Sequence, residues 1–155
     1  MNKKIKNSFG LVVLLASVVF LNACSDPEEK PKNVITDADG ITIDLTWTTG
    51  GDALADTDLD LFLYDEDEVE IDRGFTTNFE TVYLSADQPN GTYTIAVKSY
   101  NKVNKATSYS VIVDGETPSN PYAFHSNYAK DDTFHEINVL TVTKAGTKYT
   151  VTPIN

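Results

Sequence analysis

The chain has 155 residues and a net charge of −11, with 12 basic and 23 acidic side chains. The length suggests one domain, and 41% apolar residues, including 10% aromatic ones, is a globular composition. The acidic balance argues against nucleic-acid binding, because a phosphate backbone is met by a concentrated basic surface. A single cysteine excludes an internal disulfide bond and a zinc site built from several cysteines.

The first residues have the pattern of a targeting segment. A cationic start is followed by an apolar run from Phe9 to Leu21, which is too short to cross a membrane as a helix and is typical of a signal peptide. The run ends in Leu21-Asn22-Ala23-Cys24, which resembles the bacterial lipoprotein signal. The resemblance implies a signal peptide over residues 1–23 and acylation of Cys24. The alternative is an ordinary secretory signal that contains a chance cysteine.

Residues 24–40 are expected to form the acylated cysteine and a flexible tether, because Ser25–Lys32 is polar, contains two prolines and shows no periodicity. Cleavage before Cys24 would leave 132 residues with a net charge of −14, so the domain should stand off anionic lipid. The early acidic residues also resemble the export signal of surface lipoproteins in Bacteroidetes-type bacteria. The sequence thus predicts a lipid-anchored protein of the cell envelope, on the outer membrane, with its surface or periplasmic location left open.

Residues 41–155 alternate between apolar and polar side chains with a period of two, which is typical of strands that are buried on one face. The alternating runs are Ile41–Trp47, Leu59–Tyr64, Val82–Leu84, Tyr93–Val97, Tyr109–Val113, Ile137–Val142 and Tyr149–Val151. The turn residues Pro89-Asn90-Gly91 and Ala145-Gly146 each predict a hairpin. A change of phase between Val139 and Leu140 indicates either a bulge or burial of both faces. We therefore expect an all-β fold, a jelly-roll-like antiparallel β-sandwich of about eight strands.

An acidic run from Asp52 to Asp72 holds ten carboxylates and no basic residue. On an extended chain Asp56, Asp58 and Asp60 would project from one face about 7 Å apart, and a calcium ion is the simplest counter-charge for such a row. The alternative is a solvated acidic face that maintains solubility.

Nothing in the sequence favours an enzyme. Asp58 and Asp60 could act as an acid–base pair on a glycosidic bond, but their surroundings are acidic and open rather than apolar. His125 and His135 lack a metal-binding pattern, and no motif of a serine nucleophile or a phosphate-binding loop is present.

Tyr122, Phe124 and Tyr128 have the same parity along the chain, so on an extended strand they would share a face. Aromatic side chains on a surface stack on sugar rings or on peptide side chains. This segment is the candidate ligand-binding surface, and its alternative role is to fill the core.

Three segments resemble the bacterial prepeptidase C-terminal type of β-sandwich domain and related uncharacterised secreted domains. These are Leu45-Thr46-Trp47, the Asp-Leu-Asp-Leu-containing segment Thr57–Asp65, and Gly91–Val97 with Tyr100. The resemblance implies a jelly-roll-like sandwich without catalysis of its own, and some domains of this type bind calcium or extracellular polymers. It implies a calcium site at Asp58 and Asp60, with Glu80 as a partner.

The sequence thus predicts a non-catalytic, lipid-anchored envelope module that binds a polysaccharide or protein partner, with calcium as a stabilising cofactor. The alternative is a structural or assembly lipoprotein that holds an envelope complex together and binds no soluble ligand. Exposure of Tyr122, Phe124 and Tyr128 would favour the first function, and their burial the second.

Overall fold

The computed structural model describes residues 33–154, apart from 77–78, 101–102, 118–119 and 134. Within these residues the chain forms ten strands and one helical turn. In chain order these elements are β1 (Val34–Thr36), β2 (Gly40–Thr48), α1 (Ala53–Asp56), β3 (Leu59–Tyr64), β4 (Glu70–Gly74), β5 (Glu80–Ser85), β6 (Gly91–Ser99), β7 (Thr107–Gly115), β8 (Tyr122–Tyr128), β9 (Glu136–Ala145) and β10 (Lys148–Pro153).

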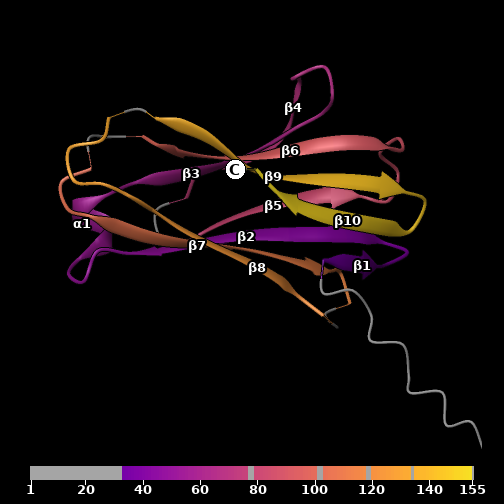
Figure 1. Cartoon of the computed structure of the whole chain (residues 1–155), viewed down its shortest axis with the longest axis horizontal. Helices are drawn as coiled ribbons and strands as arrows, with labels where there is room; N and C mark the ends of the chain where they lie inside the picture. Colours follow the sequence, from indigo (N-terminus) through magenta and orange to yellow (C-terminus); the bar gives the residue numbers. More distant parts are fainter. Residues whose placement is uncertain (1–32, 77–78, 101–102, 118–119, 134, 155) are drawn as a thin grey trace, which may run out of the picture.

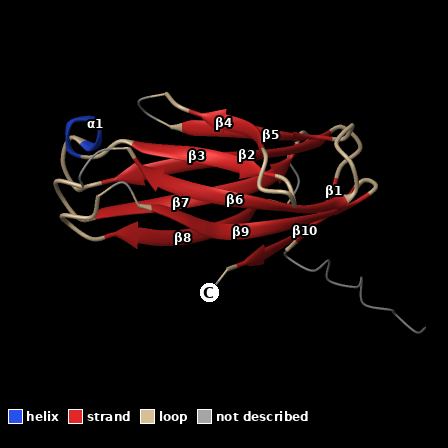
Figure 2. Ribbon diagram, turned by 90° about the horizontal axis from the view of Figure 1, so that it is seen from above, coloured by secondary structure: helices blue, strands red, loops and turns tan. Residues whose placement is uncertain are grey.

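Two antiparallel sheets face each other, so the predicted β-sandwich is confirmed (Figure 1). One sheet has six strands in the order β1-β10-β9-β6-β3-β4, and the other has four in the order β5-β2-β7-β8. In the view from above, α1 lies at one end of the sandwich and β1 near the other (Figure 2). Strand β2 connects the two ends, since it begins after β1 and leads to α1.

The core lies between the sheets. Every second residue of a strand points into it, because successive side chains of a strand point to opposite faces. Ile41, Ile43 and Leu45 of β2 are fully buried, and the intervening residues lie on the outer face. On the opposite sheet Leu59, Leu61 and Leu63 of β3 are also fully buried. The apolar contact between these two faces is the main stabilisation of the fold.

Strand β9 contains the predicted bulge. Its pairing with β6 matches Ile95 with Leu140 and then Ala96 with Asn138, so Val139 has no partner in the ladder. The extra residue lets both Val139 and Leu140 be buried. The apolar residues therefore change phase at this position without loss of the core.

The structure differs from the sequence-based predictions at the N-terminal boundary of the sandwich and at one turn. The sandwich begins before residue 41, because β1 pairs with β10 and Ile35 is buried in the core. A three-residue strand is too short to show alternation, so residues 34–40 had the appearance of tether. The turn at Pro89-Asn90-Gly91 is also no hairpin, because β5 and β6 belong to different sheets. The turn at Gly146 does join the paired strands β9 and β10, with a positive φ of 62°.

Candidate functional site

Asp58 directly precedes β3 and Asp60 is its second residue, on the outer face of the six-stranded sheet. Their neighbours Leu59 and Leu61 point into the core, so the period of two turns both carboxylates the other way. Asp60 pairs in register with Lys98 of β6. The prediction that Asp58 and Asp60 share a face is thus confirmed.

Asp56 does not belong to this pair. It ends the helical turn α1 instead of lying on an extended chain, so the predicted row of three carboxylates is wrong at this position. Its carboxylate accepts a hydrogen bond from Thr49 at 3.0 Å and forms an ion pair with Lys105 at 2.8 Å. The hydrogen bond from Lys105, followed by that from Thr49, lowers the pKa of Asp56. Its charge is therefore already balanced within the chain.

Glu80, the first residue of β5, is fully buried. Its Oε2 accepts a hydrogen bond from the backbone N–H of Thr76 at 2.9 Å, while its Oε1 has no partner among the described residues. The carboxylate lies against Gly74, where an added Cβ would come within 2.5 Å of Oε2, so only glycine fits there. An unpartnered buried carboxylate oxygen is costly, and it points to an interaction that the folded chain alone does not supply.

The three carboxylates Asp58, Asp60 and Glu80 all have raised pKa values. Burial is the first cause in each case, because a desolvated carboxylate favours its neutral form. Repulsion from Asp58 further raises the pKa of Asp60, and Asp60 and Asp58 raise that of Glu80. Arg73 and Lys98 lower the pKa of Asp60 without reversing its shift. Burial, and for Asp60 and Glu80 also the neighbouring carboxylates, therefore disfavours the charged form of these groups.

A hollow of about 330 Å³ opens beside this pair, lined by Asp58, Asp60, Arg73, Phe75 and Tyr100. Phe75 is 72% exposed and Tyr100 is 56% exposed, although both are large aromatic side chains. The backbone N–H of Tyr100 donates to the carbonyl of Asp58 at 2.9 Å, which fixes the segment after β6 beside the start of β3. The hollow thus combines two carboxylates with two exposed aromatic walls.

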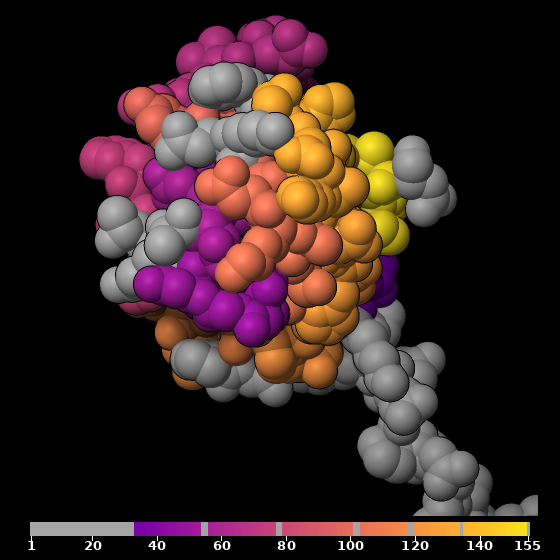
Figure 3. Space-filling view, turned by 90° about the vertical axis from the view of Figure 1, so that its left-hand side faces the viewer, coloured from indigo at the N-terminus to yellow at the C-terminus, as the bar shows by residue number. Residues whose placement is uncertain are grey.

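The hollow belongs to the α1 end of the sandwich, which faces the viewer in Figure 3. There α1 (purple) and the segment after β6 (coral) lie side by side, joined by a hydrogen bond from Asn104 N–H to the Asp56 carbonyl. Phe79, 56% exposed, lies beside Arg73 and Phe75 in an adjoining depression. Exposed aromatic side chains therefore gather at this end.

Sequence reasoning found the two aspartates but not Arg73 or Phe75. Arg73 lies in β4, an edge strand without a clear apolar alternation, and Phe75 directly follows that strand. The only sequence signal for the aromatic wall was Tyr100, through the resemblance described above. Phe75 had no signal in the sequence, because it follows the end of β4 and belongs to no alternating run.

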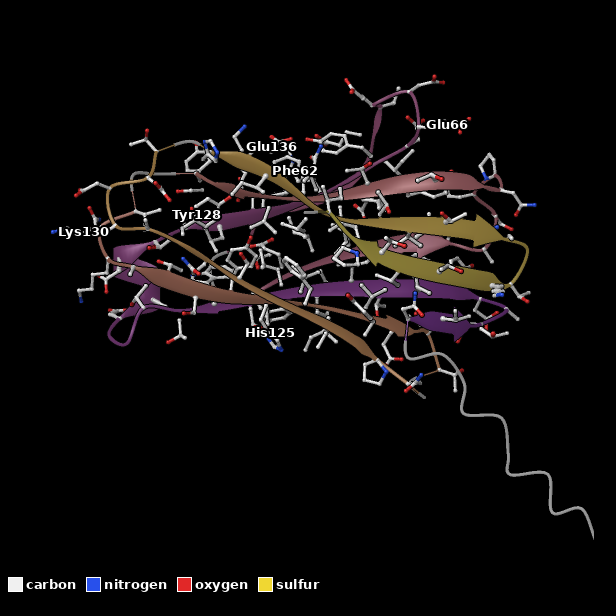
Figure 4. All side chains as sticks on the ribbon, in the orientation of Figure 1. Phe62, Glu66, His125, Tyr128, Lys130 and Glu136 are labelled. Carbon is white, nitrogen blue, oxygen red and sulfur yellow. The ribbon has the colours of Figure 1, made fainter. Side chains whose placement is uncertain are left out.

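The predicted aromatic surface lies elsewhere and faces inward. Tyr122, Phe124 and Tyr128 do share one face of β8, as their parity predicts, but this face packs against the core. Tyr128 is buried between the two sheets (Figure 4), and its hydroxyl lies 2.7 Å from the carbonyl oxygens of Val97 and His135. Tyr122 and Phe124 are half-buried. The alternative role, that these residues fill the core, is the one that the structure shows.

The histidines lie at the surface. His125 is exposed on the outer face of β8 (Figure 4), where its Nδ1 is 2.8 Å from Ser110 Oγ of β7. His135 is exposed just before β9.

The described part of the chain contains no group of three or more His, Cys, Asp or Glu side chains that could hold a metal ion. It also contains no helix long and apolar enough to cross a membrane. The predicted signal peptide, Cys24 and the predicted tether up to residue 32 lie outside the described residues. No protein-family model matches the chain, and a search of curated proteins finds no match.

Proposed function

We propose that the chain is a non-catalytic, lipid-anchored module of the cell envelope that binds a polysaccharide or protein partner through the hollow beside Asp58 and Asp60. The observation that carries this proposal is the concentration of exposed aromatic side chains at one place, beside the carboxylates of Asp58 and Asp60. Binding sites combine apolar walls with a few polar groups that fix orientation. The signal at Leu21–Cys24 supports the anchor on Cys24.

A binding assay with aromatic variants tests this function. The variant Phe75→Ala/Tyr100→Ala removes both walls and leaves the core intact, because both side chains are exposed. Purified protein is tested for co-sedimentation with envelope fractions and for binding to a panel of polysaccharides. We expect the double variant to lose binding, while Ile112→Ala, an exposed apolar residue on the other sheet, retains it. Equal binding by the wild type and the double variant would exclude the hollow.

The structural or assembly role is a second candidate. It is favoured by the burial of Tyr128 and the inward orientation of Tyr122 and Phe124, the outcome expected for that role. A chain of this kind would associate stably with envelope proteins but would be insensitive to Phe75→Ala/Tyr100→Ala. The same assay therefore distinguishes the two functions.

We also propose calcium as a stabilising cofactor at Asp58, Asp60 and Glu80. The orphaned Oε1 of Glu80 supports this, since calcium binds carboxylate oxygens. We expect thermal unfolding of Ser25–Asn155 to shift upward with calcium but not with magnesium. A ligand at one hundred times its Kd stabilises by about 2.7 kcal/mol, which is a shift of several degrees.

The calcium-induced shift should disappear in Asp58→Asn and Asp60→Asn and persist in Asp67→Asn, which removes an exposed carboxylate in the β3–β4 turn. The absence of any calcium-specific shift at millimolar concentration would contradict the metal site.

A further inference from the structure

We propose that the hollow receives a lysine or arginine side chain of a protein partner. This inference rests on the proposed function and deepens it, because it names the chemical group that the module binds.

The charge of Asp58 and Asp60 favours a cation in the hollow. The carboxylates of Asp58 and Asp60 have no hydrogen-bond or ion-pair partner among the described residues. Arg73 and Lys98 lower the pKa of Asp60, but each forms its ion pair with another carboxylate, Arg73 with Glu70 at 3.7 Å and Lys98 with Glu136 at 3.5 Å. An additional positive charge would therefore relieve the repulsion between two partly desolvated carboxylates.

The buried carboxylate of Glu80 lies near this pair and adds to the acidic character of the region. Its carboxylate lies against Gly74 and lines the depression next to the hollow, and the two share Arg73 and Phe75. The repulsion that Asp60 and Asp58 exert on Glu80 shows that the three groups act on one another. Glu80 is fully buried and its Oε1 has no partner among the described residues, so it is an observation independent of Asp58 and Asp60.

The aromatic walls of the hollow also favour a basic side chain. Phe75 and Tyr100 offer aromatic rings beside the carboxylates, and a cation near the face of a ring is attracted to its π electrons. Phe75 already makes this contact within the chain, because the guanidinium carbon of Arg73 lies 5.4 Å from its ring centroid. The methylene stem of a lysine or arginine would pack on the same exposed rings.

These features favour an organic cation over the other occupants. A calcium ion at Asp58, Asp60 and Glu80 would compete for the same carboxylates, but it would make no use of the aromatic walls of the hollow. A neutral sugar could stack on the walls but would leave the charges unbalanced. An anionic group would be repelled.

A peptide titration tests the inference. The full chain, purified as the cell processes it, is titrated with the five-residue peptide acetyl-Gly-Gly-Lys-Gly-Gly-amide and followed by NMR at Tyr100. The matched peptides carry arginine, norleucine or glutamate in place of lysine. We expect the lysine and arginine peptides to bind at least about tenfold more tightly than the norleucine peptide, and their binding to weaken as salt is added.

Two variants of equal charge serve as controls for each other. Asp58→Asn/Asp60→Asn should weaken the binding of the lysine peptide by about tenfold or more, because it removes both charged acceptors. Asp67→Asn/Asp87→Asn changes the net charge equally at exposed positions away from the hollow and should leave binding unchanged.

Equal binding of the lysine and norleucine peptides, or equal weakening in both double variants, would overturn the inference. So would a site that binds calcium but no basic peptide. Polysaccharide binding that depends on Phe75 and Tyr100 without any response to basic peptides would also overturn it while leaving the proposed function in place. If basic peptides bind but no envelope component does, the inference stands and the proposed function fails.

Discussion

The charged form of the Asp60 side chain lowers the stability of the folded chain. It is buried on the outer face of the sheet beside Asp58, and its pKa is raised by burial and by that neighbour. Between its ordinary and its raised pKa, the folded chain binds more protons than the unfolded chain. The free energy of unfolding contributed by this group therefore falls as the pH rises through that window. Asp58 and Glu80 act in the same direction, since burial raises the pKa of both.

The variant Asp60→Asn should therefore be more stable than the wild type at neutral pH. We expect the Tm at pH 7 to rise by about 2–4 °C, which corresponds to about 1 kcal/mol for a domain of this size. The difference should shrink as the pH falls through the raised pKa of Asp60, because the wild-type side chain then takes up a proton and becomes neutral. Thermal unfolding across this pH range measures both effects. A gain of the same size in Asp67→Asn would show that net charge alone is responsible.

Sequence reasoning at this scale identified Asp58 and Asp60 because a period of two needs only local information. It failed at Asp56, where a single turn of helix interrupts the extended chain and Lys105 supplies a counter-charge. It could not find Phe75, because exposure of an aromatic residue depends on what the rest of the fold leaves uncovered. Single residues of the site are thus predictable only where they follow the strand pattern.

At the scale of elements, β8 is linked to the opposite sheet by one side chain. Tyr128 projects from β8 in the four-stranded sheet, and its hydroxyl donates toward the carbonyl of Val97, in β6 of the six-stranded sheet. Tyr149 of β10 is equally buried, but its hydroxyl has no partner among the described residues. The hydroxyl groups of these two core tyrosines therefore contribute differently to the stability of the fold.

Replacement of each tyrosine by phenylalanine should give unequal results. Tyr128→Phe loses a buried hydrogen bond and should lower the free energy of unfolding by about 1–2 kcal/mol. Tyr149→Phe removes an unsatisfied hydroxyl and should leave stability unchanged or slightly higher. Urea denaturation of the two variants measures the difference. Equal destabilisation would mean that Tyr149 has a partner, such as a buried water.

The strands that the sequence predicted are those with two or more buried apolar residues at a spacing of two. Strand β4 has a weaker pattern, with Glu70, Ile71 and Asp72 none of them fully buried, and β8 alternates with aromatic residues that suit a surface as well as a core. Edge strands have one neighbour, so their side chains are less constrained. Their pairing depends on residues distant in the chain, so it cannot be predicted from the local sequence.

For the whole molecule, the boundary of the folded unit depends on β1. Ile35 fills the core, and the carboxylate of Asp37 accepts hydrogen bonds from the backbone N–H groups of Asp39, Gly40 and Thr117. These bonds, with that of Thr117 first, lower the pKa of Asp37, so its contribution to stability is lost as the pH falls through that lowered value. Residues 33–40 therefore close one end of the sandwich.

A chain that starts at residue 39 should accordingly be much less stable than one that starts at residue 33. Loss of the buried Ile35 side chain alone should cost about 2–4 kcal/mol, and the hydrogen bonds of Asp37 add to this. Urea denaturation of the two chains, with Ile35→Ala as an intermediate case, measures the effect. Equal midpoints would restore the boundary at residue 41 that the alternation suggested.

The separation of β1 from the hollow has a consequence for where a basic partner can be captured. The nine residues of β2 run from the β1 end to the α1 end, a distance of about 30 Å. Anionic headgroups attract basic side chains as well, but their field decays within about 8–10 Å at physiological salt. On a chain anchored at Cys24, the hollow would lie several screening lengths beyond the bilayer. A basic partner there would meet the carboxylates of the hollow without competition from the lipid surface.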